Sequence, residues 1–399
     1  MRENGESGYL IAGTPAFRRA RLSLFAAGYA TFATLWCVQP LMPEFAREFA
    51  VSPAQSALAL SLPTGLLAFA LLVAGAVSDT LGRKPVMLAS LLASGALSVL
   101  AALTPDWHWL LAVRALEGIA LSGLPAVAMA YIGEEVEPRS AGLAMGLYIG
   151  GSALGGMSGR ILTAVIADVA NWRVAMAAIG LLGLLAAGCL WAGLPASRHF
   201  ARRPAGLRDL GRAWRSHLAD PALRGLFVTG FVLLGGFITV YNYAGFRLAA
   251  PPFDLRPAVV GAIFMVYMAG AVASPWFGAA AARHGSGRML LAAVLLTLVG
   301  LALMLPASPV TFAAGLTLFT IAFFGAHTIA SGWVGQRART ARAQASAIYL
   351  FFYYMGATAV GYAGGWFWTG MGWGGVTVLV GAMMAIAALI ALRLWRMPA

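Results

Sequence analysis

Apolar residues along this chain form long runs that are separated by short polar stretches. Each of twelve such runs is long enough to cross a bilayer as a helix; they lie near residues 21–43, 56–78, 85–104, 108–131, 140–166, 172–194, 223–248, 257–281, 288–306, 309–334, 343–368 and 373–395. A span needs about 20 mainly apolar residues, because each helical residue advances the chain by only about 1.5 Å. The twelve runs occupy most of the 399 residues, so we predict an all-α membrane protein.

One polar stretch is much longer than the others, and it divides the chain almost in half. We therefore expect a tail at 1–20, a first six-helix bundle at 21–195, a basic linker at 196–222 and a second six-helix bundle at 223–396. Three matches at spacings of 202, 203 and 203 residues indicate that the halves are duplicated and pseudo-symmetric: Leu24-Phe25-x-x-Gly28 recurs as Leu226-Phe227-x-x-Gly230, Gly75 as Gly278, and Arg139 as Arg342. Repeats of this kind suit a substrate site between two bundles at mid-membrane.

Composition supports the membrane assignment and narrows the partners. Hydrophobic residues make up 60% of the chain and charged residues only 10%, which lies outside the soluble class. Most of the 27 Lys and Arg fall on one side of the predicted topology, so both termini and the linker are expected in the cytoplasm. The net charge of +13 then suits anionic lipid headgroups and not nucleic acid.

The most specific motif lies in the inner loop after the second run. It has the pattern G-x-x-x-D-x-x-G-R-K, formed by Gly75, Asp79, Gly82, Arg83 and Lys84. A glycine at the turn allows positive φ, and a carboxylate here can accept hydrogen bonds from an arginine.

This loop resembles that of the major facilitator superfamily, whose pattern between helices two and three is G-x-x-x-D-x-x-G-R-[KR]. The resemblance implies two six-helix bundles that alternate access to a central site, with this loop as a cytoplasmic latch. The second half has Ala282 where the acid would stand, so the latch is expected to be asymmetric. We expect Asp79 and Arg83 to form a network with Glu134 or Glu135 at the end of the fourth run.

The fourth run carries two ionisable residues, Arg114 and Glu117, within an apolar stretch. Charges inside a span are costly and are usually paired or face a cavity, and a spacing of three puts these two on one helix face. The segment is similar to the family motif R-x-x-Q-G of proton-coupled members, with Glu117 in place of the amide. A permanent ion pair and a proton-exchanging site both remain open. Gln39 is expected at a similar depth, as a hydrogen-bond partner.

The fifth run contains glycines spaced for close helix contact, at Gly151, Gly155, Gly156 and Gly159. The segment is similar to the family's antiporter motif G-x-x-x-G-P-x-x-G-G, with Gly156 in place of the proline and Arg160 in place of the last glycine. Exchange transport and plain helix packing both remain open.

Further polar and aromatic residues in the second half are candidates for the cavity wall. Phe323 and His327 share one face of the tenth run with Ser331; the others are Tyr241, Asn242, Tyr243, Tyr349, Phe352 and Tyr353. His327 could carry a proton or be held by a neighbour.

The whole chain looks closest to the bacterial twelve-helix drug:proton antiporter branch of the superfamily, which includes arabinose-efflux-permease-like members. The expected function is proton-coupled export of a small organic compound; proton-coupled uptake of a sugar or organic acid is the alternative. An enzyme is disfavoured, since no HExxH, GxSxG or P-loop pattern occurs. We expect a monomer in the bacterial inner membrane, with protons, lipid and a small molecule as partners, and no cofactor, metal or nucleic acid.

Overall fold

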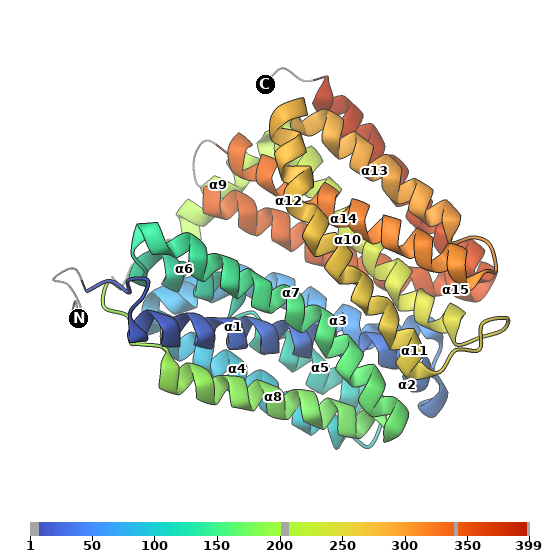
Figure 1. The fold of residues 1–399 in the computed structure, drawn as a ribbon, viewed down its shortest axis with the longest axis horizontal. Helices are drawn as coiled ribbons and strands as arrows, with labels where there is room; N and C mark the ends of the chain where they lie inside the picture. The colour runs from blue at the N-terminus through green and yellow to red at the C-terminus, as the bar shows by residue number, and fades with distance from the viewer. Residues whose placement is uncertain (1–7, 201–206, 339–341, 397–399) are drawn as a thin grey trace. The chain divides into compact units, whose positions relative to one another are not determined.

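The structure is a computed structural model that describes residues 8–200, 207–338 and 342–396 (Figure 1). The start of the predicted tail, 1–7, and part of the predicted linker, 201–206, lie outside these residues. Within them, eleven helices are long and apolar enough to cross a membrane. The last, α15 (Arg342–Trp395), is broken at Gly372 (φ 57°, ψ −143°) and so supplies two crossings. The predicted all-α fold of twelve spans is confirmed.

The first compact unit comprises Met1–Val38 and Phe69–Ala205. Its helices are α1 (Pro15–Trp36), the second part of α3 (Pro53–Leu81), α4 (Arg83–Ala102), α5 (Trp107–Leu121), α6 (Pro125–Glu135), α7 (Pro138–Val169) and α8 (Trp172–Gly193). The fourth predicted span is thus two helices, because a proline lacks the N–H that would continue α5. Side chains of Asp106 and Asn171 cap the first turns of α5 and α8.

The second compact unit comprises Gln39–Ala68 and Gly206–Ala399. Its elements are η1 (Gln39–Leu41), α2 (Met42–Glu48), the first part of α3, α9 (Leu207–Ala219), α10 (Pro221–Leu248), α11 (Pro257–Ala262), η2 (Ile263–Val266), α12 (Tyr267–His284), α13 (Ser286–Leu303), α14 (Pro309–Arg337) and α15. The helix α9 lies in the predicted linker and was not predicted.

Residues 39–68 lie in the second unit, whereas the hydropathy pattern assigns them to the first bundle. Two contacts with α15 hold the segment there. A β-carbon on Gly365 would lie less than 3.0 Å from the backbone of Ala54. The Thr64 and Thr358 hydroxyls are 3.0 Å apart. Such pairings between distant segments are invisible to a hydropathy pattern.

Closely packed helix pairs recur in the two units at equivalent positions. A β-carbon on Gly155 of α7 would lie less than 3.0 Å from the Tyr29 carbonyl of α1. The same holds for Gly356 of α15 and the Phe231 carbonyl of α10. The turn glycines Gly82 and Gly285 have φ values of 97° and 91°. These equivalences support the duplication inferred from sequence.

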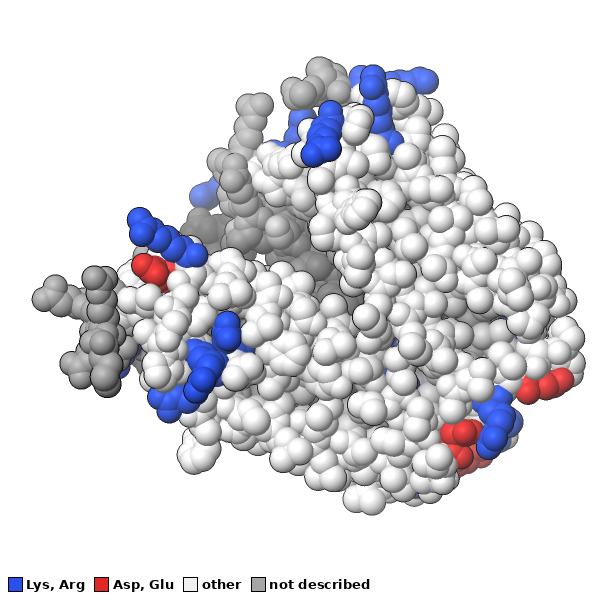
Figure 2. Space-filling model, in the orientation of Figure 1, with Lys and Arg blue, Asp and Glu red and all other residues white. Residues whose placement is uncertain are grey.

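The outer surface of the helices is apolar between their ends. Leu185 of α8 and Trp276 of α12 are 69% and 78% exposed. On the face shown in Figure 2, charged side chains gather near helix ends and leave the surface between them uncoloured. Exposed apolar surface on this scale suits hydrocarbon and not water, as expected for a multi-pass membrane protein.

The packing of α1 on α7 gives a first prediction. We expect Gly155→Val to destabilise the protein by about 1–3 kcal/mol, because the added methyl groups have no room beside the α1 backbone. Thermal unfolding in detergent, followed by tryptophan fluorescence, measures the effect. Gly150→Ala on the same helix is the control, since no described residue lies within 4 Å of a β-carbon there. A Gly155→Val protein as stable as the control would contradict this account.

Candidate functional site

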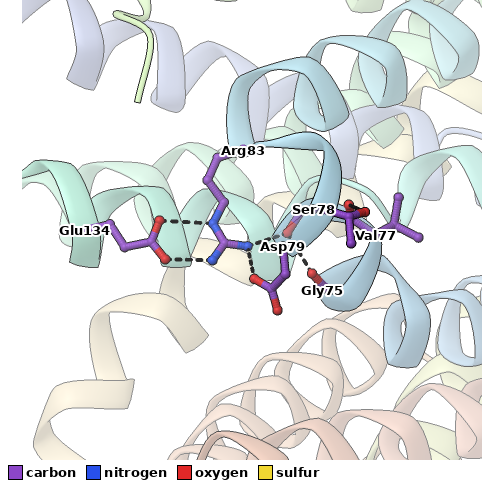
Figure 3. Close-up of polar contacts among 7 residues, drawn as sticks. Gly75, Val77, Ser78, Asp79, Arg83 and Glu134 are labelled. Carbon is purple, nitrogen blue, oxygen red and sulfur yellow. Dashed lines mark hydrogen bonds and ion pairs between the residues drawn. The ribbon is translucent and has the colours of Figure 1, made fainter. Parts of the chain in front are cut away.

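The inner loop after α3 is organised around one guanidinium, that of Arg83 (Figure 3). Its Nε and Nη2 donate to the two carboxylate oxygens of Glu134, at 3.0 and 2.6 Å. Its Nη1 lies 2.6 Å from Asp79 Oδ1 and 2.5 Å from Ser78 Oγ. The left-handed conformation of Gly82 turns the chain so that Arg83, at the start of α4, faces back toward the end of α3. One arginine therefore ties α3, α4 and α6 together.

The neighbouring acid, Glu135, does not bond to Arg83 but contacts the start of the linker. Its carboxylate accepts the His199 N–H at 2.9 Å and lies 3.3 Å from His199 Nδ1. The next linker residue, Phe200, packs its ring under the Arg83 guanidinium at 5.3 Å. His199 also stacks on Tyr9 of the tail, at 4.1 Å between ring centroids. Tail, linker and inner loop are thus joined within the first unit.

Two loop residues have roles that differ from those expected. Lys84 does not join the arginine network; its Nζ donates to the carbonyls of Trp191 and Leu194 at the end of α8, at 2.9 and 2.5 Å. Cations are favoured at a helix C-terminus. Gly75 was expected to permit close helix contact, but none of the described residues lies within 4 Å of a β-carbon there.

A cavity of about 570 Å³ opens beside this loop and is lined by Leu81, Gly82, Arg83, Lys84, Pro85, Leu88, Ala196, Ser197 and Phe200. It contains none of the predicted proton-coupling residues. We therefore do not assign it to substrate.

The second unit has an ion pair of its own at the corresponding helix end. Arg337, at the end of α14, donates from Nε to Asp220 Oδ2 at 3.2 Å, and Asp220 caps α10. Partial burial acts to raise the pKa of Asp220, but the N–H of Ala222 and the Arg337 guanidinium hold that pKa below its ordinary value. Arg337 is 203 residues beyond Glu134, so the two repeats carry opposite charges at equivalent helix ends. The two repeats therefore differ in charge at this helix end, a difference that was not predicted.

Arg114 and Glu117 form an ion pair with neither side chain exposed to solvent. Arg114 Nη1 donates to Glu117 Oε2, and the same guanidinium donates to the carbonyls of Thr34 and Leu35 at the end of α1, at 3.3 and 3.1 Å. Glu117 Oε1 is buried and makes no hydrogen bond of ordinary geometry among the described residues, although the Ser98 hydroxyl is close enough to act on the carboxylate. An acid with one unsatisfied oxygen can accept a proton there without losing a protein contact.

Gln39 lies in the second unit, where its Nε2 donates to Asn242 Oδ1 at 2.7 Å. These two residues are also 203 positions apart, so they are equivalents in the two repeats. The bond between Gln39 and Arg114 stays a prediction, because the two residues belong to different units.

Arg160 of α7 is a second fully buried arginine in the first unit, 1% exposed. It donates to the carbonyl of Gly156, and its guanidinium lies 4.7 Å from the Trp36 ring at the end of α1. Near Arg160, the glycines of α7 face α1. A β-carbon on Gly151, Gly155 or Gly159 would lie close to the α1 backbone. The motif glycines thus have a packing role.

The aromatic candidates of the second unit fall into two groups. In the first, His327 Nδ1 lies 3.0 Å from the Tyr349 hydroxyl, and the His327 ring stacks on Tyr353 at 4.5 Å and on Phe323 at 6.1 Å. Phe237 of α10, which was not predicted, stacks on Phe323 at 3.8 Å. The structure therefore brings α10, α14 and α15 together around His327.

The second group has other polar partners, although Tyr241 also packs against Phe237 at 4.9 Å between ring centroids. Tyr241 bonds to Thr320 at 2.7 Å, and Tyr243 donates to the Gly361 carbonyl at 2.9 Å. Phe352 stacks on Phe227 at 5.9 Å between ring centroids. Ser331 donates to the carbonyl of His327, four residues earlier on the same helix, at 2.7 Å. Its hydroxyl is therefore used within α14.

The sequence pattern missed several residues that complete these sites. Ser78 and Phe200 contact Arg83, His199 contacts Glu135, and Trp36 contacts Arg160. For the contact between Trp36 and Arg160, the one signal in the sequence was that Arg160 is a charged residue within an apolar run. Among the described residues, no group of three or more His, Cys, Asp or Glu could hold a metal ion.

Comparisons with known proteins agree with this architecture. The family model described as Major Facilitator Superfamily matches residues 24–252. The chain is 44% identical over 379 residues to the uncharacterized MFS-type transporter YybF of Bacillus subtilis (strain 168), covering 95% of this chain and 94% of that protein. It is also 44% identical over 390 residues to the inner membrane transport protein YnfM of Escherichia coli (strain K12), covering 97% and 93%.

Solved structures show the same fold at low sequence identity. A bacterial homolog of the human lysosomal transporter Spinster, inward-facing and unoccupied, aligns with a TM-score of 0.74 at 16% identity, over 96% of this chain and 97% of that one. A mutant form of the nucleoside transporter NupG aligns with a TM-score of 0.73 at 14% identity, over 94% and 98%. With two full-length relatives and a family model covering more than half its length, the chain belongs to the Major Facilitator Superfamily.

Proposed function

We propose that this protein is a proton-coupled secondary transporter that moves a small organic compound by alternating access, with Glu117 as the proton site. The observation that carries the proposal is the fully buried pair of Arg114 and Glu117. Its relatives are named as transporters, which points to transport and not catalysis. The expected setting is the bacterial inner membrane, with both termini in the cytoplasm and the protein acting as a monomer.

The chemistry of the pair suits reversible protonation. Burial favours the neutral form of a carboxylate, whereas an adjacent guanidinium favours the ionised form. Because these influences oppose each other, small changes in the distance between Arg114 and Glu117, or in the access of water, shift the balance. Alternating access supplies such a change in every cycle, so Glu117 takes up a proton in one state and releases it in another.

The network of Arg83 acts, in this proposal, as the inner latch. It fixes the inner ends of α3, α4 and α6 as one block within the first unit. Side chains of Asp79 and Glu134 remain 27% and 32% exposed, so solvent screens their attraction to Arg83 and the network can be rearranged at modest cost. A rearrangeable network of this kind is what a cyclic conformational change requires.

Two directions of transport are candidates. Export in exchange for protons is supported by the glycine motif of α7 and by a partial similarity to a protein named chloramphenicol resistance protein CraA of Acinetobacter baumannii, 34% identical over 175 residues (43% of this chain). Uptake together with protons is the second candidate.

We expect Glu117→Gln to abolish proton-driven transport while leaving substrate counterflow intact, because the amide keeps a hydrogen bond to Arg114 but cannot carry a proton. Proteoliposomes with an imposed pH gradient measure this, using a compound selected by a thermal-shift screen of metabolites and toxic compounds. Asp254→Asn is the control: it alters an exposed acid whose φ of 47° suits asparagine. Full pH-driven transport by Glu117→Gln would refute the role of this residue.

We expect Asp79→Asn to lower the transport rate about tenfold with little loss of stability, since a partly exposed ion pair contributes only about 0.2–1 kcal/mol. Transport assays are compared with the amount of protein inserted in the membrane. Asp254→Asn is again the control, because this acid is exposed, lies in the second unit and has a φ of 47° that suits asparagine. If both variants transport equally well, the network is not a latch.

The direction of transport is tested in vesicles of both orientations. Export by exchange predicts that everted vesicles accumulate the compound when their lumen is acidified. Uptake with protons predicts accumulation in right-side-out vesicles with an acidic exterior. Accumulation that survives a protonophore in both systems would reject proton coupling altogether.

A further inference from the structure

We propose that the second unit binds an anionic phospholipid in a groove at its inner end, between the start of α10 and the end of α15. The headgroup phosphate lies between Arg224 and Arg393, and an acyl chain follows the apolar floor of the groove. The inference goes beyond the proposed transport, because it concerns a lipid partner and its test needs no transported compound.

The groove is a cavity of about 260 Å³ with two walls. Residues of α10 form one wall and residues of α15 the other: Arg224, Gly225 and Val228, and Ile390, Arg393 and Leu394. Gly225 lets the two helices meet at the floor, since a β-carbon there would lie 3.2 Å from Ile390 Cγ2. The groove therefore lies entirely within the second unit and depends on the packing of one helix pair.

Charged and apolar side chains are separated along each wall. On α10, Val228 follows Arg224 by four residues; on α15, Ile386 and Ile390 precede Arg393 by seven and three. Residues at these spacings share one face of a helix. Each wall thus has an arginine at its inner end and an apolar strip toward the membrane, where Val228 and Ile386 are 38% and 40% exposed. A phospholipid has the same order, with a charged head followed by an apolar chain.

The two arginines have no carboxylate partner among the described residues. Both Arg224 and Arg393 are exposed, and neither forms an ion pair within the part of the chain that the structure describes. The nearest acid along α10 is Asp220. Its Oδ1 accepts two backbone N–H groups at the start of α10, and its Oδ2 accepts the Nε of Arg337. Both guanidiniums can therefore donate to one bound anion.

The position of Arg224 on its helix is unfavourable for a cation. It is the fourth residue of α10, and the partial positive charge of a helix N-terminus repels a cation. By contrast, Arg393 lies in the last turn of α15, where a cation is favoured. A phosphate beside Arg224 reverses the unfavourable term, because it is attracted both by the guanidinium and by the start of the helix.

A lipid suits this surface better than a soluble anion does. Solvent and salt weaken the attraction of exposed arginines for a small anion that makes no other contact. The apolar strips of the groove add a contact that only an anion with a hydrocarbon chain can use. Basic pockets between membrane helices on the cytoplasmic side are typical binding sites for anionic headgroups.

The first test uses the wild-type protein in detergent. We expect dioleoyl phosphatidylglycerol to raise the melting temperature by about 3 °C or more, because it binds the folded state, and phosphatidylcholine with the same chains to raise it by less than about 1 °C. Glycerol 3-phosphate and inorganic phosphate, which have no chains, should give no shift. Equal stabilisation by phosphatidylcholine, or stabilisation by the phosphates without chains, would overturn the proposal.

The second test locates the site. The double variant Arg224→Gln/Arg393→Gln should bind phosphatidylglycerol about 25-fold more weakly, because each arginine near an anionic headgroup contributes about fivefold. Arg215→Gln/Arg283→Gln is the matched control: it makes the same change of charge at two exposed arginines of the second unit that do not line the groove. Bound lipid is measured by native mass spectrometry. An equal loss in both variants indicates a diffuse response to net charge and rejects the groove.

A further pair of variants decides the matter if the glutamine variant does not fold. Arg224→Lys/Arg393→Lys keeps both charges and should retain binding within about fivefold of wild type. Val228→Glu places a carboxylate in the groove on a side chain long enough to reach the inner surface, and it should abolish binding. Retention of binding in both variants, or its loss in the lysine variant, contradicts a phosphate site between these two residues.

Discussion

The structure depends on one constraint: an ionised side chain inside a bilayer must be compensated by the protein itself. Arg114 meets this constraint with Glu117 and with carbonyls from the end of α1. The break between α1 and η1 makes these carbonyls available, because the last carbonyls of a helix have no intrahelical partner. The buried charge of Arg114, the break after α1 and the packing of α5 against α1 therefore depend on one another. Removing the break would take these carbonyls away from Arg114.

Glycine determines how closely the helices that surround this arrangement approach one another. The contact of Gly155 with the Tyr29 carbonyl brings α7 against α1, and Gly356 repeats the contact for α15 and α10. Backbones that approach so closely are rigid as pairs, since any side chain on the facing positions would separate them. The two duplicated halves thus share this close packing of helix pairs. Their charges have diverged, as Glu134 and Arg337 show.

The sequence was sufficient to predict the elements and much of the inner loop. Hydropathy placed the spans, and residue spacing put Arg114 and Glu117 on one helix face. It did not predict that Glu134 binds Arg83 while Glu135 binds His199, because the choice depends on which face of α6 meets α4. The helix α9 was not predicted because its sequence is polar on average and was taken for a loop, although its apolar residues recur at the spacing of an amphipathic helix. The assignment of 39–68 to the second unit depends on contacts between residues about 300 positions apart.

The start of the linker is anchored at its first aromatic residues. His199 is held by Glu135 and Tyr9, and Phe200 lies against Arg83. Any pull on the chain beyond residue 200 is therefore transmitted to the carboxylates at the end of α6. A fluorescent label or a fused domain inserted here would not be a neutral addition, since it would load the very contacts that hold the inner loop in place.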